Sequence, residues 1–494
     1  MKPLLPSFNG LKSWGSSALQ TALRCSVQHI ATHTDMRLQD PRASNWPSVI
    51  NGPLFIDRTY NWGKIFFIAE PVNNSPILIL MRLGVESASL LLGALQAGLF
   101  PILMKPTTPT HLVLEAVRES SCSLVAVPSG LLLEIVKHGF LLVSQGDDYA
   151  ILRSPYASVP HLKLGNTSII GILSSGSTGK PKVIIHTLDR VLHNATLHAT
   201  SIGLRAEDTV ALTLPLNFSA GLVAGLLSTL ITGASGIFID AQKINPRRLL
   251  PQLRVSVCMA TPATIMSVYD TTTLDRARVV TVGGDAINYR LACELIEYCG
   301  RTTEVYSTYG MTEAGPRISS SIVTREILEH YNAIPLGKPL EGVQLDIRTT
   351  DTVAGSGELL VSTPTAMYGY LNPSLESSTT QDKPFGTIRT GDIFKVLSDG
   401  MVFVGRSGRL IVRGGENIYP TVIESAILKH LDVDDVWVTA EPDELLGHVP
   451  KAYIIGNRKI ESSYMAKKLR QVLPSSYIPA IWEYAEKLPD HAKK

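Results

Sequence analysis

The segment with the strongest chemical character is the stretch SSGSTGKPK at residues 174–182, directly after the apolar run TSIIGIL. Glycines let a backbone turn its N–H groups inward, hydroxyl groups donate further hydrogen bonds, and lysines add positive charge. These are the components of a cradle for an anion such as phosphate. Composition alone leaves an equal alternative, a mobile polar loop rich in glycine and serine.

The same stretch does not fit the P-loop pattern GxxxxGK[ST]. Gly176 and Gly179 are too close together, and Pro181 occupies the position at which that pattern requires a magnesium-binding Ser or Thr. A phosphate loop of another kind is therefore the functional interpretation, and the remaining motifs of the chain must decide between it and a plain polar loop.

Further motifs lie along the chain in a fixed order, and their residues are LQAGLFPILMKP (95–106), VGGDAI (282–287), YSTYGMTEAG (306–315), RTGD (389–392) and VGRSGRLIVRGGENIYPTVIES (404–425). Together with the phosphate loop, this ordered set resembles the adenylate-forming superfamily, which comprises acyl- and aryl-CoA synthetases, peptide-synthetase adenylation domains and firefly luciferase. The resemblance extends over roughly residues 55–490 and is nearest to the acyl- and aryl-acid branch. Each motif alone is weak, whereas the set in this order is specific.

The resemblance implies that ATP and Mg²⁺ are bound. Lys182 would hold the β- and γ-phosphates with the loop residues Ser177, Thr178 and Gly179. Thr312 would hydrogen-bond the α-phosphate. Glu313 would hold Mg²⁺, a hard ion that prefers carboxylate oxygen. Taken singly, Glu313 would more often be a solvated surface acid.

The nucleoside of ATP is assigned to other motifs. Tyr309 would offer an aromatic face to adenine, with Gly283 and Gly284 allowing close backbone approach. Asp392 would accept hydrogen bonds from both ribose hydroxyls, and Arg406 would donate to ribose or phosphate. The plain alternatives are turns for the glycine and Thr-Gly-Asp motifs, and core packing for Tyr309.

The reaction implied by the resemblance has two steps. The carboxylate of an acid attacks the α-phosphorus of ATP, giving acyl-AMP and pyrophosphate, and positioning and charge neutralisation supply most of the catalysis. The acyl group then passes to a thiol, and CoA is the favoured acceptor. One alternative acceptor is the phosphopantetheine arm of a carrier protein. A second alternative is a non-catalytic nucleotide-binding relative.

The sequence departs from the family pattern at two places. The hinge of the family reads Gly-Arg-x-Asp, whereas this chain has Gly408 and then Arg409 after Arg406. Near the C-terminus the family carries Leu-Pro-x-x-x-x-Gly-Lys, whose lysine bridges substrate and ATP, whereas this chain ends LPDHAKK without a glycine. Either Lys494 or Lys493 replaces that lysine from a shortened loop, or the adenylation lysine is absent.

The acid pocket is expected around LPLNFSAGL at residues 214–222. This stretch contains no acidic residue, which disfavours an amino-acid substrate because a buried ammonium group without a partner is costly. Phe218 and Asn217, with Gly284, suggest an apolar or aryl acid. An equal alternative is that Asn217 only caps a turn.

Composition excludes several other classes. The net charge of +2 gives no electrostatic footprint for nucleic acid. The five cysteines form no CxxC pair, which suits a reducing compartment, and we expect a cytoplasmic protein. The apolar region ILILMRLGVESASLLLGALQAGLFPILM is interrupted by Arg82 and Glu86, so a membrane-spanning helix is not expected. The first 34 residues lack Asp and Glu, which weakly resembles a transit peptide, although an ordinary helical segment is favoured.

The expected fold class is α/β. Short β-branched runs alternate with helical segments up to about residue 362, which predicts layered, largely parallel sheets. Shorter hairpin-like strands follow, with a tight turn expected at Asp399-Gly400. We therefore expect a large N-terminal domain at residues 1–405, a hinge at 406–410, and a small, mobile α+β C-terminal domain at 411–494.

Overall fold

The computed structural model describes residues 48–49, 52–69, 74–157, 167–174, 182–241, 245–349, 355–371, 379–380, 387–414, 416–456 and 458–488. The N-terminal segment that weakly resembles a transit peptide lies outside these residues. None of the helices within them is long and apolar enough to cross a membrane.

The chain forms two compact units. Unit 1 comprises Met1–Thr281, Gly310–Arg317 and Pro364–Ser377, and unit 2 comprises Val282–Tyr309, Ile318–Thr363 and Ser378–Lys494. Strands, helices and their order confirm the predicted α/β class. The expected division at residues 1–405, 406–410 and 411–494 stays a prediction.

Unit 1 contains an eight-stranded sheet in the order β18-β8-β7-β3-β2-β4-β6-β5. The central strands β7, β3, β2 and β4 run parallel, as predicted, while β8, β6 and β5 pair antiparallel with their neighbours. The bounds are β2 (Pro76–Leu80), β3 (Phe100–Met104), β4 (Leu124–Pro128), β5 (Leu141–Gln145), β6 (Tyr149–Arg153), β7 (Ile169–Ser174), β8 (Lys182–Thr187) and β18 (Gly369–Tyr370).

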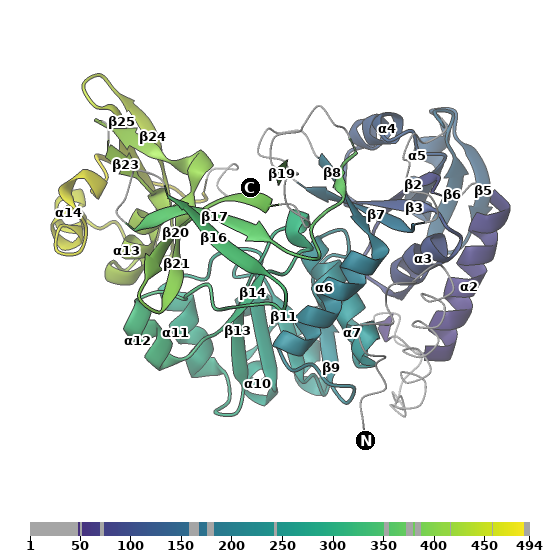
Figure 1. Ribbon diagram of the computed structural model, residues 1–494, viewed down its shortest axis with the longest axis horizontal. Coiled ribbons are helices and arrows are strands. Elements are labelled where there is room, and N and C mark those ends of the chain that lie inside the picture. The colour runs from purple at the N-terminus through teal and green to yellow at the C-terminus, as the bar shows by residue number, and fades with distance from the viewer. Residues whose placement is uncertain are drawn as a thin grey trace. The chain divides into compact units, whose positions relative to one another are not determined.

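Helices cover this sheet because its strands are apolar on both sides. Leu78 and Leu80 of β2 pack in one buried cluster with Val113 and Val117 of α4 (Thr110–Glu119), and Ile77 and other alternate residues face the other side. Figure 1 shows α4 and α3 (Val85–Gln96) on either side of these strands. The other helices near this sheet are α2 (Gly52–Ala69), η2 (Ser129–Leu131) and α5 (Leu132–Val136).

A second run of strands in unit 1 has the order β1-β10-β9-β11. Its strands β9, β10 and β11 are parallel. The bounds are β1 (Ser48–Val49), β9 (Thr209–Leu212), β10 (Ser235–Phe238) and β11 (Val257–Ala260). Its helices are α6 (Leu188–Ser201), the π-helix η3 (Ala220–Leu227), α7 (Ser228–Thr232), α8 (Pro246–Leu249), η4 (Leu250–Gln252), α9 (Ile265–Val268), α10 (Thr271–Arg276) and η5 (Thr312–Ala314).

The chain passes from unit 1 to unit 2 within β12 (Val279–Gly283). Unit 2 then contains α11 (Tyr289–Tyr298), β13 (Glu304–Tyr309), β14 (Ser319–Ile322), α12 (Arg325–Tyr331) and β15 (Lys338–Pro339). An antiparallel sheet follows, with β16 (Gln344–Thr349), β17 (Ser356–Ser362), β19 (Thr379–Thr380), β20 (Thr387–Leu397) and β21 (Gly400–Arg406). Leu397 pairs with Gly400, so Ser398-Asp399 form the turn, one residue before the expected pair.

The last part of unit 2 has a core of its own. Its strands are β22 (Ile411–Arg413), β23 (Glu416–Ile418), β24 (Asp435–Asp443), β25 (Gly447–Ile455) and β26 (Ile481–Tyr484). Its helices are α13 (Pro420–His430), α14 (Ser462–Leu469) and η8 (Ser475–Tyr477), and η7 (Ser407–Arg409) precedes them. Buried residues from Ile411 to Ile478 form a single apolar cluster, which agrees with the small α+β part predicted for the C-terminal tail.

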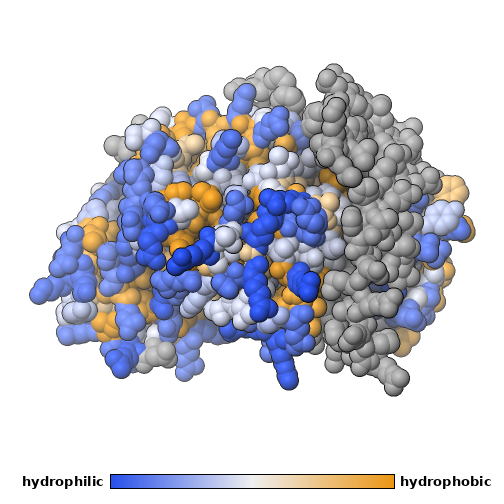
Figure 2. All heavy atoms as spheres, turned by 90° about the horizontal axis from the view of Figure 1, so that it is seen from below, coloured by the Kyte–Doolittle hydropathy of each residue, from blue (hydrophilic) through white to orange (hydrophobic). Residues whose placement is uncertain are grey.

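The surface carries both hydrophilic and hydrophobic residues. Figure 2 shows hydrophilic and hydrophobic residues interspersed over one face. Scattered surface apolar residues are normal in folded proteins, so this face indicates no particular partner.

Candidate active site

Lys182 is the first residue of β8 and lies directly opposite Ser174 of β7. This pairing fixes both ends of the predicted phosphate loop on neighbouring strands. The loop itself, with Ser177, Thr178 and Gly179, lies outside the described residues. The Lys182 Nζ atom is 5.5 Å from the centre of the Tyr370 ring, which is within the range of a cation–π contact.

Tyr370 connects Lys182 to Glu313. Strand β18 pairs with β8 so that Tyr370 lies opposite Ile184, two residues from Lys182. The Tyr370 hydroxyl donates to Glu313 Oε1 over 3.3 Å, and the backbone N–H of Met367 donates to the Glu313 carbonyl over 2.7 Å. Sequence reasoning missed Tyr370, although an aromatic residue next to a glycine in a polar stretch was a visible signal.

Thr312 lies in the same cluster. Its Oγ1 is 2.9 Å from Ser219 Oγ, and its carbonyl accepts from His186 Nε2 over 2.8 Å. His186 is almost fully buried, and burial lowers its pKa to about 4, so the ring is neutral at pH 7 and donates from Nε2. Thus Lys182, Thr312 and Glu313, predicted from distant motifs, lie in one network, and His186 and Ser219 were not foreseen.

Gly310 makes this arrangement possible. A Cβ atom at Gly310 would lie 1.7 Å from the carbonyl oxygen of Pro316, far inside any allowed contact. Glycine is therefore the residue that lets the segment carrying Thr312 and Glu313 fold back on itself.

The predicted acid-binding loop lies beside Thr312 through the Ser219 hydrogen bond. Phe218 is 51% exposed, whereas Asn217 is buried and its Oδ1 has no hydrogen-bond partner in the described part of the chain. Asn217 therefore caps no turn through that oxygen. The π-helix η3 begins at Ala220, directly after the loop, and π-helical turns occur frequently at functional sites.

Unit 2 contains the second cluster, around Asp392. The register of β20 and β21 places Asp392 opposite Arg406, and Arg406 Nε lies 2.9 Å from Asp392 Oδ1. This contact is an ion pair without hydrogen-bond geometry, so Oδ1 lacks a hydrogen-bond donor among the described residues. Tyr309 donates its hydroxyl to Asp392 Oδ2 over 2.6 Å.

Burial dominates the electrostatics of this cluster. Asp392 is 4% exposed, and burial raises its pKa, although Arg406 and the Tyr309 hydroxyl oppose the shift. Burial and the neighbouring Asp392 carboxylate also raise the pKa of Tyr309, which stays protonated and donating. The Tyr309 ring meets Phe394 edge to face at 5.4 Å between centres, so its orientation is fixed from two sides.

The Thr-Gly-Asp turn is held by Glu358, which sequence reasoning did not find. Glu358 pairs with Arg389 at 2.8 Å and accepts from the backbone N–H of Gly391 over 3.2 Å. Gly391 has φ 71°, in the left-handed region that favours glycine. The Thr390 hydroxyl donates to the Leu359 carbonyl over 2.8 Å. These contacts anchor the residue that precedes Asp392.

Gly283 and Gly284 lie where β12 ends. Gly283 is buried and Gly284 is exposed with φ 89°, so the chain makes a turn here that other residues rarely adopt. The exposed Asp285 that follows contributes to the raised pKa of Asp392. The carboxylate of Asp285, the residue that follows the Gly-Gly motif, is therefore close enough to Asp392 within unit 2 to affect its pKa.

Arg409, in the hinge sequence, makes contacts that the sequence did not predict. Gly408 stands where the family has Asp, and the next residue is Arg409. The Arg409 Nη2 lies 2.6 Å from Glu424 Oε1 and donates to the Val438 carbonyl over 3.0 Å. Its guanidinium also stacks 3.4 Å above the Trp437 ring. A Cβ atom at Gly408 would meet nothing within 4 Å. Arg406 and Arg409 are thus each held by a partner, with only Ser407 and Gly408 between them.

The donor set fits magnesium. Among the described residues no group of three or more His, Cys, Asp or Glu side chains could hold a metal ion. Mg²⁺ characteristically uses one or two carboxylates and completes its shell with phosphates and water. Glu313, with hydroxyl-bearing Thr312 and Tyr370 nearby, matches that requirement. The C-terminal lysines Lys493 and Lys494 lie outside the described residues.

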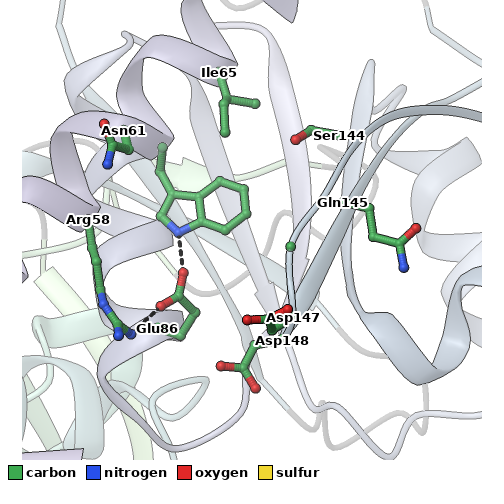
Figure 3. A pocket seen from close by; sticks show the side chains of 10 residues that line it. Arg58, Asn61, Ile65, Glu86, Ser144, Gln145, Asp147 and Asp148 are labelled. Carbon is green, nitrogen blue, oxygen red and sulfur yellow. Dashed lines mark hydrogen bonds and ion pairs between the residues drawn. The ribbon is translucent and has the colours of Figure 1, made fainter.

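A cavity of about 330 Å³ lies elsewhere in unit 1, and none of the predicted site residues lines it. Figure 3 shows Arg58 of α2 pointing at Glu86 of α3, with Asp147 and Asp148 on the opposite side. Glu86 accepts from Arg58 and from the Trp62 indole, each over 2.6 Å. These contacts tie α2 to α3.

Comparison with known proteins gives two family matches. A profile of the AMP-binding enzyme family matches residues 72–371, and a profile of the AMP-binding enzyme C-terminal domain matches residues 422–493. The 2-succinylbenzoate–CoA ligase of Bacillus licheniformis is 28% identical over 347 residues, which cover 68% of this chain and 70% of that protein. The ligase of the same name from Bacillus pumilus is 30% identical over 342 residues, 67% of each protein.

Solved structures share the fold. The o-succinylbenzoate CoA synthetase of Bacillus subtilis, in complex with its acyl-adenylate intermediate, has a TM-score of 0.73 at 21% identity, covering 95% of this chain and 96% of that chain. An anthranilate CoA ligase in complex with anthranoyl-AMP has a TM-score of 0.74 at 19% identity, covering 94% of each. The Bacillus subtilis enzyme has also been solved with ATP and a magnesium ion.

Proposed function

The chain belongs to the AMP-binding enzyme family, and we propose that it activates an aryl carboxylic acid with ATP and transfers the acyl group to CoA. The observation that carries the proposal is a pair of contacts in unit 1. Tyr370 links Lys182 to Glu313, and Thr312, the residue before Glu313, is bonded to Ser219 of the predicted acid-binding loop. A cation, a carboxylate and hydroxyl groups gathered in this way suit the chemistry of a triphosphate with its metal.

The triphosphate end of ATP is assigned to unit 1. Lys182 neutralises charge on the β- and γ-phosphates, and Thr312 donates its hydroxyl to the α-phosphate that the acid attacks. Glu313 would hold Mg²⁺, which neutralises phosphate charge when bound. His186 and Ser219 hold Thr312 from its carbonyl and its hydroxyl, so they act as positioning residues.

The nucleoside end is assigned to unit 2. Asp392 Oδ1 is a buried carboxylate oxygen without a hydrogen-bond donor, which suits the hydroxyls of ribose. Arg406 lies beside it and is mostly exposed, with its side chain 67% accessible, so it can reach a nucleotide. Tyr309 and the Gly283-Gly284 turn are the candidates for adenine.

An aryl acid is favoured by two observations. Phe218 is exposed beside the loop that is bonded to Thr312, and Asn217 Oδ1 has no partner. The curated relatives and one structural neighbour are named for aryl acids, 2-succinylbenzoate and anthranilate. CoA is the proposed acceptor because those relatives are CoA ligases. A carrier-protein phosphopantetheine stays the alternative acceptor. The five cysteines of the sequence form no CxxC pair, which supports a reducing location such as the cytoplasm.

Exchange of labelled pyrophosphate into ATP tests the first step. Purified full-length protein with Mg²⁺ and a panel of aryl, fatty and amino acids should catalyse exchange with the aryl acids only. Lys182→Met should lower the exchange rate by about 100-fold or more, whereas Lys338→Met, at an exposed position in β15, should not change it.

The identity of the thiol that accepts the acyl group is tested by adding either CoA or a pantetheinylated carrier protein and measuring the thioester product by mass spectrometry. Formation of acyl-CoA supports the proposal, and transfer only to the carrier protein supports the alternative. ATP binding without exchange for any acid would show a non-catalytic relative, and the missing Gly-Lys at the C-terminus would then explain the loss.

A further inference from the structure

Strand β5 is the free edge of the eight-stranded sheet that contains β8. The sheet ends in the order β4-β6-β5, so β5 pairs only with β6 among the described strands. Figure 1 shows β5 at the outer end of this sheet, next to β6. An edge strand presents unpaired backbone N–H and C=O groups on its outer side, and these groups can pair with a strand of another chain. The edge of β5 is therefore a surface at which the sheet can be continued.

The side chains of β5 are apolar and exposed. The strand reads LLVSQ, and Leu141, Leu142 and Val143 are 67%, 51% and 37% exposed. Helix α5, which precedes the strand, adds the exposed residues Leu133 and Val136. Exposed apolar residues gathered on neighbouring elements mark interaction sites, unlike those scattered singly over a surface. The edge thus combines backbone pairing groups with apolar side chains.

Strand β5 lacks the residues that keep native edge strands from pairing. Such strands are blocked by lysines, prolines or inward-pointing charges, and none of the five residues of β5 is charged or a proline. The register of β5 against β6 shifts between Leu142 and Ser144, and a bulge of this kind increases the twist of the strand. A second copy of the chain carries the same bulge and the same twist. The two edges therefore match each other better than either matches a flat foreign strand.

The residues that flank β5 carry opposite charges. Lys137 and His138 precede the strand, Asp147 and Asp148 follow it, and all four are exposed. Lys137 and the two aspartates form no ion pair in the described part of the chain. The Ser129 N–H donates to the Asp148 carbonyl over 2.9 Å, which fixes the backbone that carries the aspartates. One end of the strand is therefore basic, the other is acidic, and both are available to a partner.

Antiparallel pairing of two copies uses both features of this edge. We propose that two copies of the chain associate through β5, edge to edge about a two-fold axis near Val143, so that two eight-stranded sheets become one continuous sheet. In an antiparallel pair the start of one strand lies beside the end of the other. Lys137 of each copy then lies at the same end of the interface as Asp147 and Asp148 of the second copy. Parallel pairing would bring like charges together instead.

This pairing leaves the candidate active site free. Strand β8, which begins with Lys182, is separated from β5 by the five strands β7, β3, β2, β4 and β6. At about 4.8 Å between neighbouring strands, the distance across the sheet is about 29 Å. Association and catalysis are independent in this arrangement, so the failure of either proposal does not bear on the other.

Sedimentation velocity of the full-length protein over a range of concentrations tests the association. The unaltered protein should convert from a species of the chain mass to one of twice that mass as concentration rises. Leu141→Lys should raise the dissociation constant of the dimer by about 100-fold or more, because the symmetric interface then receives two like charges. Leu445→Lys is the matched control, at an almost fully exposed leucine in the turn between β24 and β25, and should leave the dissociation constant unchanged.

A charge swap tests the antiparallel orientation. Lys137→Asp should raise the dissociation constant by about 5- to 10-fold, because each end of the interface then brings acidic groups together without the lysine. Adding Asp147→Lys to Lys137→Asp should restore most of the association, because opposite charges again meet across the two copies. A parallel interface would show no such rescue, and that result would contradict the proposed geometry.

A cysteine variant tests the position of the axis. Opposed residues of antiparallel strands lie within the range of a disulfide bond. Oxidised Val143→Cys should therefore run as a covalent dimer on a denaturing gel, whereas Leu445→Cys should not. Thermal unfolding of Leu141→Lys at concentrations where both proteins are monomeric should match the unaltered protein, which separates loss of association from loss of fold.

Three results would overturn the proposal. A protein that stays monomeric at every concentration would leave the edge to a strand of another protein. A dimer that Leu141→Lys does not weaken would associate through a different surface. Slow hydrogen exchange of the β5 amides that does not depend on protein concentration would show that another part of the same chain covers the edge. The proposal predicts instead that this exchange slows as the dimer forms.

Discussion

Arg409 directly follows Gly408, the residue that stands where the family's hinge has Asp, and the contacts of Arg409 allow a quantitative prediction. The guanidinium of Arg409 bonds Glu424 at 2.6 Å and stacks on Trp437 at 3.4 Å. Glu424 also accepts from the Val438 N–H over 2.8 Å. Replacing Arg409 by Met retains an apolar contact with Trp437 and removes the counterion of Glu424.

The expected cost follows from burial. The side chains of Arg409 and Glu424 are 28% and 11% exposed. Breaking a buried pair costs about 3–5 kcal/mol, and the partial exposure of Arg409 reduces this to about 2–3 kcal/mol because solvent screens the charge. A loss of that size should speed hydrogen exchange of β24 amides by about 30- to 150-fold, at 1.4 kcal/mol for each tenfold change.

Hydrogen–deuterium exchange of the peptide that contains β24, residues 435–443, measures this effect locally. Arg325→Met is the control, because Arg325 and Glu297 lie 3.9 Å apart with both side chains 60% exposed, and such pairs contribute at most about 1 kcal/mol. Adding Glu424→Gln to Arg409→Met should restore part of the protection, because no buried charge is then left without a partner.

The effect should depend on pH with a defined sign. Burial raises the pKa of Glu424, and Arg409 opposes that shift, so removing Arg409 should raise the pKa further. A carboxyl group whose pKa is higher in the folded state than in the unfolded state loses stability as pH rises through the folded value. The deficit of Arg409→Met should therefore be larger at pH 8 than at pH 5. Equal protection in Arg409→Met and Arg325→Met at pH 8 would refute this reasoning.

Three further predictions concern the site. Asp392→Asn should raise the Kd for ATP by about 10- to 100-fold in calorimetric titration, because charge-assisted hydrogen bonds to ribose are lost; an unchanged Kd would remove Asp392 from the nucleotide site. Gly310→Ala should give insoluble or inactive protein, because a Cβ there meets Pro316 at 1.7 Å, whereas Gly408→Ala should fold normally because its Cβ meets nothing within 4 Å. Burial lowers the pKa of His186 to about 4, so between this pH and about 6.5 the unfolded state binds a proton that the folded state does not bind. The free energy of unfolding should therefore fall as pH drops from about 6.5 towards 4. His186→Asn should reduce this pH dependence in urea titrations.

The fold was largely readable from the sequence where strands are apolar on both faces. The runs FPILM and SLVAV became β3 and β4 almost residue for residue, because buried parallel strands require continuous apolar residues. The predicted hairpin turn at Asp399-Gly400 was wrong by one residue, because the turn lies at Ser398-Asp399. The Asp-Gly pair was the only local signal for its position. The two compact units could not be foreseen, because each is assembled from separated segments of the chain.

The grouping of the candidate site residues was predictable where their types carry chemistry within a motif. Lys182, Thr312 and Glu313 lie in one network, and Asp392 faces Arg406 through strand register. The supporting residues were missed because their roles depend on tertiary contacts. Glu358 resembles any strand glutamate in sequence, and its role is visible only from its bond to the Gly391 N–H.

The central claim is that an acid carboxylate attacks the α-phosphorus of ATP, and one isotope measurement tests it directly. The enzyme is supplied with ATP, Mg²⁺, CoA and 2-succinylbenzoate whose carboxylates carry ¹⁸O, and the AMP released is analysed by mass spectrometry. Attack through the carboxylate leaves one of its oxygens on phosphorus, so the AMP should carry a single ¹⁸O. AMP without label, or label only in inorganic phosphate or pyrophosphate, would contradict activation by adenylation.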